Sequence, residues 1–115
     1  PPEERESYWW IAAIRALGQP PPDVRWVHVG DRGEDLFGVY DEARRQGTDW
    51  LIRVCQDRRI LTSAGEQRLL PYARSLPVRL RQTVTIRRRP AGASDEVTVC
   101  VSGGAVQLRP SRNEA

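Results

Sequence analysis

The fold is decided by the stretch Val24-Arg25-Trp26-Val27-His28-Val29-Gly30-Asp31-Arg32-Gly33-Glu34-Asp35-Leu36. An apolar run ends there in an acid-rich turn, and an amphipathic pattern follows. This order predicts a strand, a tight turn and a helix, with Asp31 at the carboxyl end of the strand. Ligands and metals gather at that end in open α/β sheets, and Mg²⁺ prefers carboxylate oxygens. Because Asp is also a common helix cap, the pattern alone leaves open whether Asp31 binds a metal or only caps the helix.

Helix and strand patterns continue on both sides of this stretch. Residues 4–17 predict a helix with a broad apolar face. Residues 24–29 predict a strand that is apolar on both faces, as expected for a sheet covered on both sides. Residues 34–46 predict a helix that stops at Gly47, and residues 50–55 predict the next strand. A strand, a helix and a strand in this order imply a right-handed parallel crossover.

The pattern changes after Pro77. Residues 56–59 read as a polar loop, and residues 64–75 predict a short helix despite Pro71. From Val78 the residues alternate, with Arg79, Arg81, Thr83, Thr85 and Arg87 on one face and Val78, Leu80, Gln82, Val84 and Ile86 on the other.

A second strand signal lies near the end of the chain. Gly103-Gly104 predicts a tight hairpin between residues 96–102 and 105–109, with Val101 opposite Val106 and Val99 opposite Leu108. The expected fold is therefore α/β, with an incomplete strand–helix–strand core over residues 1–76 and an antiparallel β piece over residues 77–115.

The length and composition indicate a segment of a longer protein. The 115 residues suffice for one small domain, yet they begin at Pro1-Pro2 and include no Met, so we expect an excised segment. No apolar run reaches the length of a membrane span and no secretion leader is present, so we expect a cytoplasmic protein. Cys55 and Cys100 lie in apolar runs and are expected to be reduced, buried thiols. His28 is expected to be a satisfied histidine near the core.

Charge is divided unevenly along the chain. Residues 1–50 hold ten acidic residues and six arginines, a net charge of −4, whereas residues 51–115 hold five acidic residues and twelve arginines, a net charge of +7. Every basic residue is Arg. An acidic half that contains Asp31 thus adjoins a basic half suited to phosphates.

Three segments, in this order, resemble the insertion-sequence-four family of bacterial transposases. Arg5-Glu6-Ser7-Tyr8-Trp9-Trp10 is similar to the family's K-E-S-x-x-W segment. His28-Val29-Gly30-Asp31-Arg32-Gly33-Glu34-Asp35 resembles its V-x-D-R-x-x-D block, and Trp50-Leu51-Ile52-Arg53-Val54 resembles its F-L-V-R strand. The resemblance covers residues 5–60 well and the tail more loosely. It implies part of an RNase H-like catalytic core, followed by the start of the family's β-rich insertion.

The resemblance implies a site as well as a fold. Asp31 matches the second member of the family's catalytic Asp-Asp-Glu triad and would bind one of two Mg²⁺ ions that drive displacement at phosphorus in transposon-end DNA. Arg32 and Arg53 match arginines expected to contact phosphates, and Asp35 is expected to orient Arg32 or cap the helix. Arg79, Arg81 and Arg87 are expected to track the DNA backbone. The alternatives are purely structural roles. Arg32 would pair with Glu34 or Asp35, Arg53 would be an ordinary cation at a strand edge, and the arginine-faced strand would only keep the protein soluble.

Two departures from the family pattern limit the expected activity. The first catalytic Asp of the family lies upstream of the matched segments. The Y-x-x-R-x-x-x-E helix that carries the Glu has only Tyr72 and Arg74 as a counterpart, at the wrong spacing. The chain is therefore expected to be inactive alone, with Mg²⁺ bound weakly or not at all. Its expected partners are DNA, the remaining transposase chain and a second copy of itself, in association with the bacterial nucleoid.

Two other functions remain open. The runner-up is a non-catalytic nucleic-acid-binding α/β module that uses the arginine-faced strand. The third is an α/β protein with a strand-end Asp as phosphoacceptor, as in receiver domains. That class also needs a Lys on a later strand, and this chain has none.

Overall fold

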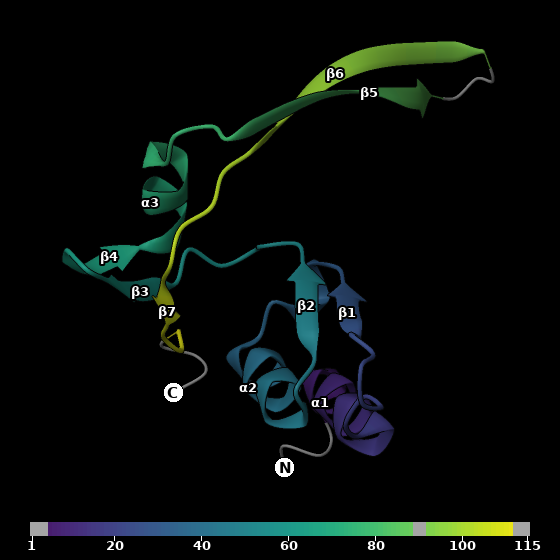
Figure 1. The fold of residues 1–115 in the computed structure, drawn as a ribbon, viewed down its shortest axis with the longest axis vertical. Coiled ribbons are helices and arrows are strands. Elements are labelled where there is room, and N and C mark those ends of the chain that lie inside the picture. The colour runs from purple at the N-terminus through teal and green to yellow at the C-terminus, as the bar shows by residue number, and fades with distance from the viewer. Residues whose placement is uncertain (1–4, 89–91, 112–115) are drawn as a thin grey trace.

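The computed structural model describes residues 5–88 and 92–111, which form a mixed α/β structure (Figure 1). Its elements in chain order are α1 (Glu6–Leu17), β1 (Val27–Gly30), the short 3₁₀ helix η2 (Arg32–Glu34), α2 (Phe37–Gln46), β2 (Asp49–Ile52), β3 (Arg59–Thr62), β4 (Gly65–Arg68), α3 (Leu69–Ser75), β5 (Leu80–Arg88), β6 (Ala93–Val101) and β7 (Gln107–Leu108). The expected α/β class is therefore confirmed at this level.

The strand–helix–strand order forms as the sequence predicts, but the helix predicted from residue 34 begins at Phe37, and the strand predicted over residues 50–55 spans Asp49–Ile52. β1 and β2 pair in parallel, with Val27 beside Asp49 and Gly30 beside Ile52. α2 connects them and ends at Gly47, which adopts the left-handed conformation with φ +73°. A residue without a Cβ adopts that conformation at little cost, so the predicted stop signal is confirmed.

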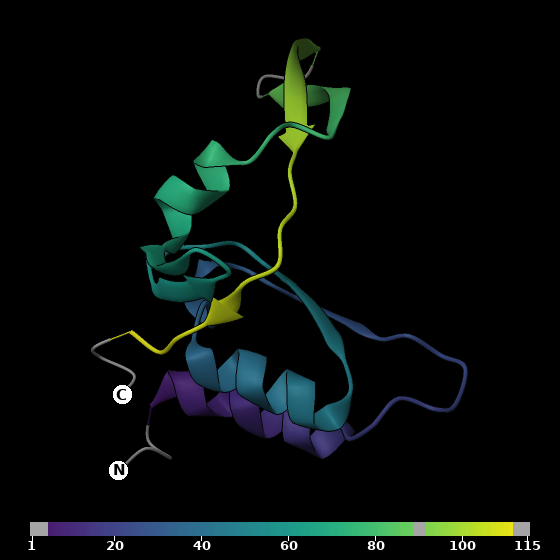
Figure 2. The ribbon, with the colours of Figure 1, turned by 60° about the vertical axis from the view of Figure 1, so that its left-hand side comes forward.

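Helices cover only one face of this two-stranded sheet. α1 and α2 lie side by side (Figure 2), and a Cβ on Gly38 of α2 would crowd the Ile11 side chain of α1. Tyr40 of α2 contacts the Trp50 ring of β2, with ring centroids 5.3 Å apart. Among the residues that the structure describes, the buried apolar side chains are Ile14, Val39, Tyr40, Ala43 and Ile60.

The other face of the β1–β2 sheet is open. Val27, Val29 and Leu51 alternate away from the helices and are 50%, 67% and 66% exposed. The expectation of a sheet covered on both sides is therefore wrong for the residues that the structure describes. These three side chains form an exposed apolar face.

A second, antiparallel sheet follows β2. β3 pairs with β4 on one side and β7 on the other. The β3–β4 turn is held by the Thr62 hydroxyl, which accepts from Ala64 N at 3.1 Å, and by Gly65, which has φ +106°. The helix predicted over residues 64–75 therefore begins only at Leu69, and Pro71 lies in its first turn, where its missing N–H is tolerated.

The hairpin predicted about Gly103-Gly104 is wrong. β6 pairs along its whole length with β5, so that Leu80 lies opposite Val101 and Gln82 opposite Val99. Leu108 pairs instead with Ile60 of β3. A continuous nine-residue ladder offers more backbone hydrogen bonds than a short strand turned on two glycines, and it decides the pairing.

The β5–β6 hairpin projects from the rest of the molecule (Figures 1 and 2). After it, the chain returns to the β3–β4 sheet as β7, so residues on both sides of position 76 share one sheet. Among the described residues, no helix is long and apolar enough to cross a membrane.

Candidate functional site

Asp31 directly follows the last residue of β1, at the carboxyl end of the parallel pair. It is the N-cap of η2, and its Oδ1 accepts a hydrogen bond from Gly33 N at 2.9 Å. The side chain is exposed. Asp31 therefore caps a helix, and because this bond engages only Oδ1, the carboxylate retains an oxygen with which to bind a ligand.

Arg53 lies beside Asp31 because the two strands end together. Gly30 pairs with Ile52, and Arg53 N donates to Gly30 O at 3.3 Å, which continues the ladder by one residue. Arg32 follows Asp31 in the turn, and both arginines are exposed. The fold thus brings three of the predicted site residues to the same edge of the sheet.

The turn after Asp31 is built on two further carboxylates. The first is Glu34, which is almost fully buried and lies 2.6 Å from His28 Nε2 through its Oε1. A Cβ on Gly30 would collide with this Glu34 carboxylate. His28 therefore has the hydrogen-bonding partner that a near-core histidine needs, and Gly30 leaves the room for it.

The second buried carboxylate is Asp35, which accepts four hydrogen bonds. Its Oδ1 accepts from Tyr40 Oη at 2.6 Å and Arg58 Nη2 at 2.8 Å. Its Oδ2 accepts from Cys55 N at 2.7 Å and Gln56 N at 2.8 Å. An ionised carboxylate has about four acceptor positions, so Asp35 is saturated and has none left for a metal.

These contacts correct the expected role of Asp35. Its carboxylate binds Arg58 rather than Arg32, and the N-cap of α2 is Leu36, whose side chain makes no cap bond. Burial raises the pKa of Asp35, but the hydrogen bonds from Tyr40, Cys55, Gln56 and Arg58 outweigh it and lower the pKa below its ordinary value. Asp35 therefore stays ionised and fixes the chain that follows β2.

Arg58 is the residue that sequence reasoning missed. It lies in a polar run read as a loop, yet its side chain is 1% exposed and lies over the Tyr40 ring. It donates to the Asp35 carboxylate and, at 3.4 Å, to the Arg109 carbonyl next to β7. Arg58 therefore ties the Asp31 turn to the second sheet. No local pattern marks it, because its partners lie 23 and 51 positions away.

The cysteines also depart from expectation. Both are free, but both are exposed rather than buried. Cys55 Sγ donates to Arg32 O at 3.3 Å. Desolvation and the nearby Asp35 carboxylate raise the pKa of Cys55, so its thiol stays protonated at neutral pH.

The predicted metal site is incomplete among the described residues. No group of three or more His, Cys, Asp or Glu side chains in residues 5–88 and 92–111 is arranged to hold a metal ion. Asp31 has an available oxygen, whereas Glu34 and Asp35 are engaged by His28 and Arg58. The residues present supply one Mg²⁺ ligand and do not by themselves fit the ion, which takes several oxygen ligands.

The other predicted DNA-binding arginines lie apart from this edge. Arg79, Arg81 and Arg87 are exposed and share one face of the β5–β6 hairpin. Both views show the hairpin well separated from β1 and β2 (Figures 1 and 2). The structure therefore gives two separate groups of candidate arginines rather than one.

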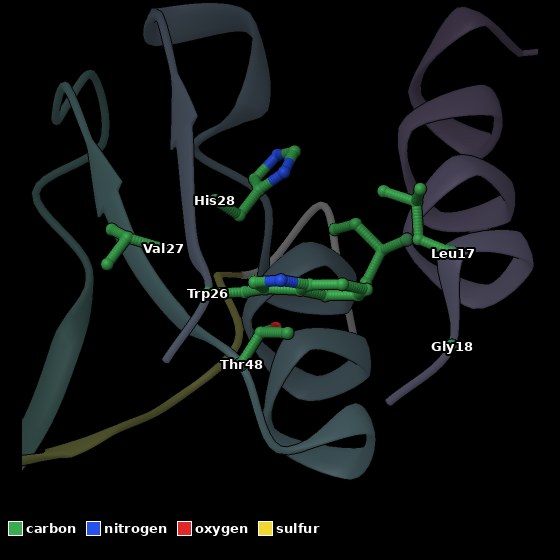
Figure 3. Close-up of a pocket in the computed structure, with 7 residues that line it drawn as sticks. Leu17, Gly18, Trp26, Val27, His28 and Thr48 are labelled. Carbon is green, nitrogen blue, oxygen red and sulfur yellow. The ribbon is translucent and has the colours of Figure 1, made fainter. Parts of the chain in front are cut away.

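A small apolar cavity lies between the end of α1 and β1 (Figure 3). Its volume is about 240 Å³, and Leu17, Trp26, His28 and Thr48 are among the residues that line it. Asp31 and the candidate arginines are not part of the lining. The cavity is therefore separate from the strand-end site.

Comparison with known proteins finds no matching family model, no matching curated protein and no matching solved structure. The resemblance to the transposase family rests on the three short segments alone.

Proposed function

We propose that this chain is a segment of the catalytic core of a cut-and-paste DNA transposase, and that Asp31 is the second carboxylate of its Asp-Asp-Glu triad. The observation that carries the proposal is the position of Asp31. Its exposed carboxylate follows the first strand of a parallel strand–helix–strand unit, with Arg53 at the end of the neighbouring strand. Ligands of open α/β sheets bind at this edge.

Each residue at the edge has a role in this proposal. Asp31 supplies one oxygen ligand for Mg²⁺, and the other two carboxylates come from outside the segments that resemble the family. The bound ions would stabilise the attacking and leaving oxygens of a displacement at phosphorus. Arg32 and Arg53 present planar guanidinium groups that match phosphate oxygens. The buried Asp35–Arg58 pair holds the turn in place and does not contact the DNA.

The proposal is tested by comparing two chains on the same DNA. One is the chain of 115 residues, and the other is a longer chain that also supplies the missing Asp and Glu. With a labelled transposon-end duplex in Mg²⁺ or Mn²⁺, we expect strand cleavage only by the longer chain. Metal-dependent cleavage by the short chain, abolished by Asp31→Ala, would contradict the need for three carboxylates. A longer chain that binds the ends and never cleaves them would contradict the enzymatic proposal.

The partners and location follow from the same proposal. The DNA is the transposon end, and the protein works in the bacterial cytoplasm, at the nucleoid. The open apolar face of β1–β2 and the apolar face of the β5–β6 hairpin would be covered by the rest of the transposase or by a second copy. On this hairpin face the apolar side chains of Leu80, Ile86, Val97, Val99 and Val101 are exposed.

A second candidate function is a nucleic-acid-binding module without catalysis. The observation that favours it is the face of the hairpin that carries Arg79, Arg81 and Arg87, which they share with Thr83 and Thr85 of the same strand and with Thr98 and Glu96 of β6. These side chains are exposed, and no buried residue of the described part of the hairpin lies on that face. The face is therefore free to track a nucleic-acid backbone without reading its sequence.

Replacing Arg79, Arg81 and Arg87 together with Gln is expected to weaken DNA binding without unfolding the chain. The dependence of log affinity on log salt is expected to flatten by up to about three units if all three arginines touch phosphate. Fluorescence anisotropy on a labelled duplex over a salt series measures both quantities. The control variant is Arg25→Gln/Arg44→Gln/Arg45→Gln, which removes the same charge from exposed positions elsewhere. Equal losses in both variants would leave net charge alone as the cause, and an unchanged slope in the hairpin variant would favour solubility as its role.

A further inference from the structure

Three arginines lie in one row across the second sheet. Arg59 of β3 is directly opposite Arg68 of β4. On the other side, Ile60 pairs with Leu108 and Arg109 N donates to Arg59 O at 3.0 Å, which places Arg109 opposite Arg59. Residues directly opposite each other in an antiparallel sheet project from the same face. We call Arg59, Arg68 and Arg109 the arginine row; all three are exposed.

This arrangement is unfavourable without a counter-charge. Neighbouring strands lie about 4.8 Å apart, and like charges directly opposite each other destabilise a sheet. One carboxylate, Glu66, lies 3.4 Å from Arg59 Nη1, and both side chains are about half exposed. Arg68 donates to the backbone carbonyl of Asp57, which carries no charge. The row therefore keeps a positive excess that an added anion would relieve.

The surface at the row is hollowed on two sides. One hollow of about 370 Å³ is lined by Asp57, Arg58, Arg59, Arg68 and Ser111. A second of about 210 Å³ is lined by Arg59, Glu66, Arg109 and Pro110. Arg59 borders both. The Asp57 carboxylate accepts from Leu70 N at 2.8 Å, which directs one of its oxygens to the start of α3.

We propose that the arginine row binds phosphate groups of a nucleic-acid strand. Guanidinium groups pair with phosphate oxygens through two parallel hydrogen bonds, and the hollows on either side of Arg59 leave room for such groups. Binding of phosphate is inferred from the arginine row itself, whereas the assignment of that phosphate to nucleic acid rests on the proposed function. Arg58 donates to both the Asp35 carboxylate and the Arg109 carbonyl, so it links the row to the Asp31 turn.

The test measures binding of a labelled oligonucleotide that has no terminal phosphate, as single strand and as duplex. It compares the wild-type chain with the row variant, Arg59→Gln/Arg68→Gln/Arg109→Gln. The row variant is expected to flatten the log–log salt dependence by about two to three units, since each lost phosphate contact contributes about 0.9 for duplex and 0.7 for single strands. The control is again Arg25→Gln/Arg44→Gln/Arg45→Gln. A row variant that matches this control in slope and affinity would overturn the proposal.

A second measurement tests whether the row variant still folds, and whether the row binds free phosphate or the phosphates of nucleic acid. Thermal unfolding in phosphate-free buffer is expected to give the row variant a midpoint close to that of the wild type, because relief of the repulsion offsets loss of the exposed Arg59–Glu66 pair. Pyrophosphate is expected to raise the wild-type midpoint and not that of the variant, because a ligand stabilises the state that binds it. If pyrophosphate does so while oligonucleotide binding is the same in both, the row binds free phosphate and the nucleic-acid proposal is overturned. The catalytic proposal is tested by strand cleavage, whereas this one is tested by the salt dependence of binding and by the response to pyrophosphate, so failure of one is distinguishable from failure of the other.

Discussion

Replacing Asp31 with Asn, in a chain that carries all three carboxylates, is expected to abolish strand cleavage and joining while binding of the transposon ends is retained. Asn suits this test because it caps a helix as well as Asp, so the bond from Gly33 N and the turn should survive. What is lost is the charge of a metal ligand. We expect a rate loss of at least about 10³-fold, the upper end of the cost of removing one electrostatic contact to a transition state.

Asp41→Asn is the matched control for this change. Asp41 lies on α2, away from the strand ends, and pairs with Arg45 at 3.0 Å, with the two side chains 41% and 66% exposed, so its removal should leave the rate unchanged. Cleavage is measured on end-labelled DNA, and end binding by gel shift on the same samples. Full activity in the Asp31→Asn variant would show that Asp31 only caps η2.

Arg58→Met is expected to have the largest effect on stability. The change leaves the Asp35 carboxylate buried without its cation, and breaking a buried pair from one side costs about 3–5 kcal/mol. Natural domains have only about 5–15 kcal/mol to lose, so the variant should be close to unfolding. The matched control is Arg45→Met, which breaks the exposed pair with Asp41 and should cost less than about 1 kcal/mol. Urea titration followed by tryptophan fluorescence measures both values, and similar losses in the two variants would contradict the role assigned to Arg58.

Acid should reveal the hydrogen bonds that Tyr40, Cys55, Gln56 and Arg58 donate to Asp35 in the wild-type chain. The pKa of Asp35 in the folded chain lies below its ordinary value of 3.8, so its contribution to stability is fully present above that value. The contribution is lost as the pH falls from 3.8 through the lowered pKa, because the carboxylate must then be protonated. Arg58→Met removes one of the four hydrogen bonds that lower the pKa of Asp35, so the variant is expected to lose somewhat less stability over this pH range than the wild type, as measured by urea titration at each pH.

The first half of the chain was predictable because its signals are local. The apolar run before Gly30, the acidic turn and the stop at Gly47 each depend on residues within one or two turns of one another. They were enough to place Asp31 at the end of a strand in a parallel pair. Arg53 follows from the same reasoning, since the strand in front of it ends beside Gly30.

The second half was predicted less well because its pairings are distant. Gly103-Gly104 is a strong local turn signal, yet β6 pairs with β5 and leaves β7 for β3, which lies nearly fifty positions earlier. The arginine row appears only once that register is known. Arg58 could not be distinguished from an exposed loop cation, because burial of a charge depends on partners that no short window contains.

Because β7 returns to β3, the segment between β4 and β7 is an insertion, here called the arm, that begins and ends in the same sheet. Everything between β4 and β7, namely α3 and the β5–β6 hairpin, leaves one side of β3 and comes back on the other. Two strand spacings amount to about 10 Å, a gap that a few extended residues span. Lengthening or exchanging such an excursion costs the rest of the fold little, because loop-closure entropy grows slowly with length. The arm can therefore change its contacts over evolutionary time while Asp31 and the Asp35–Arg58 pair keep their geometry.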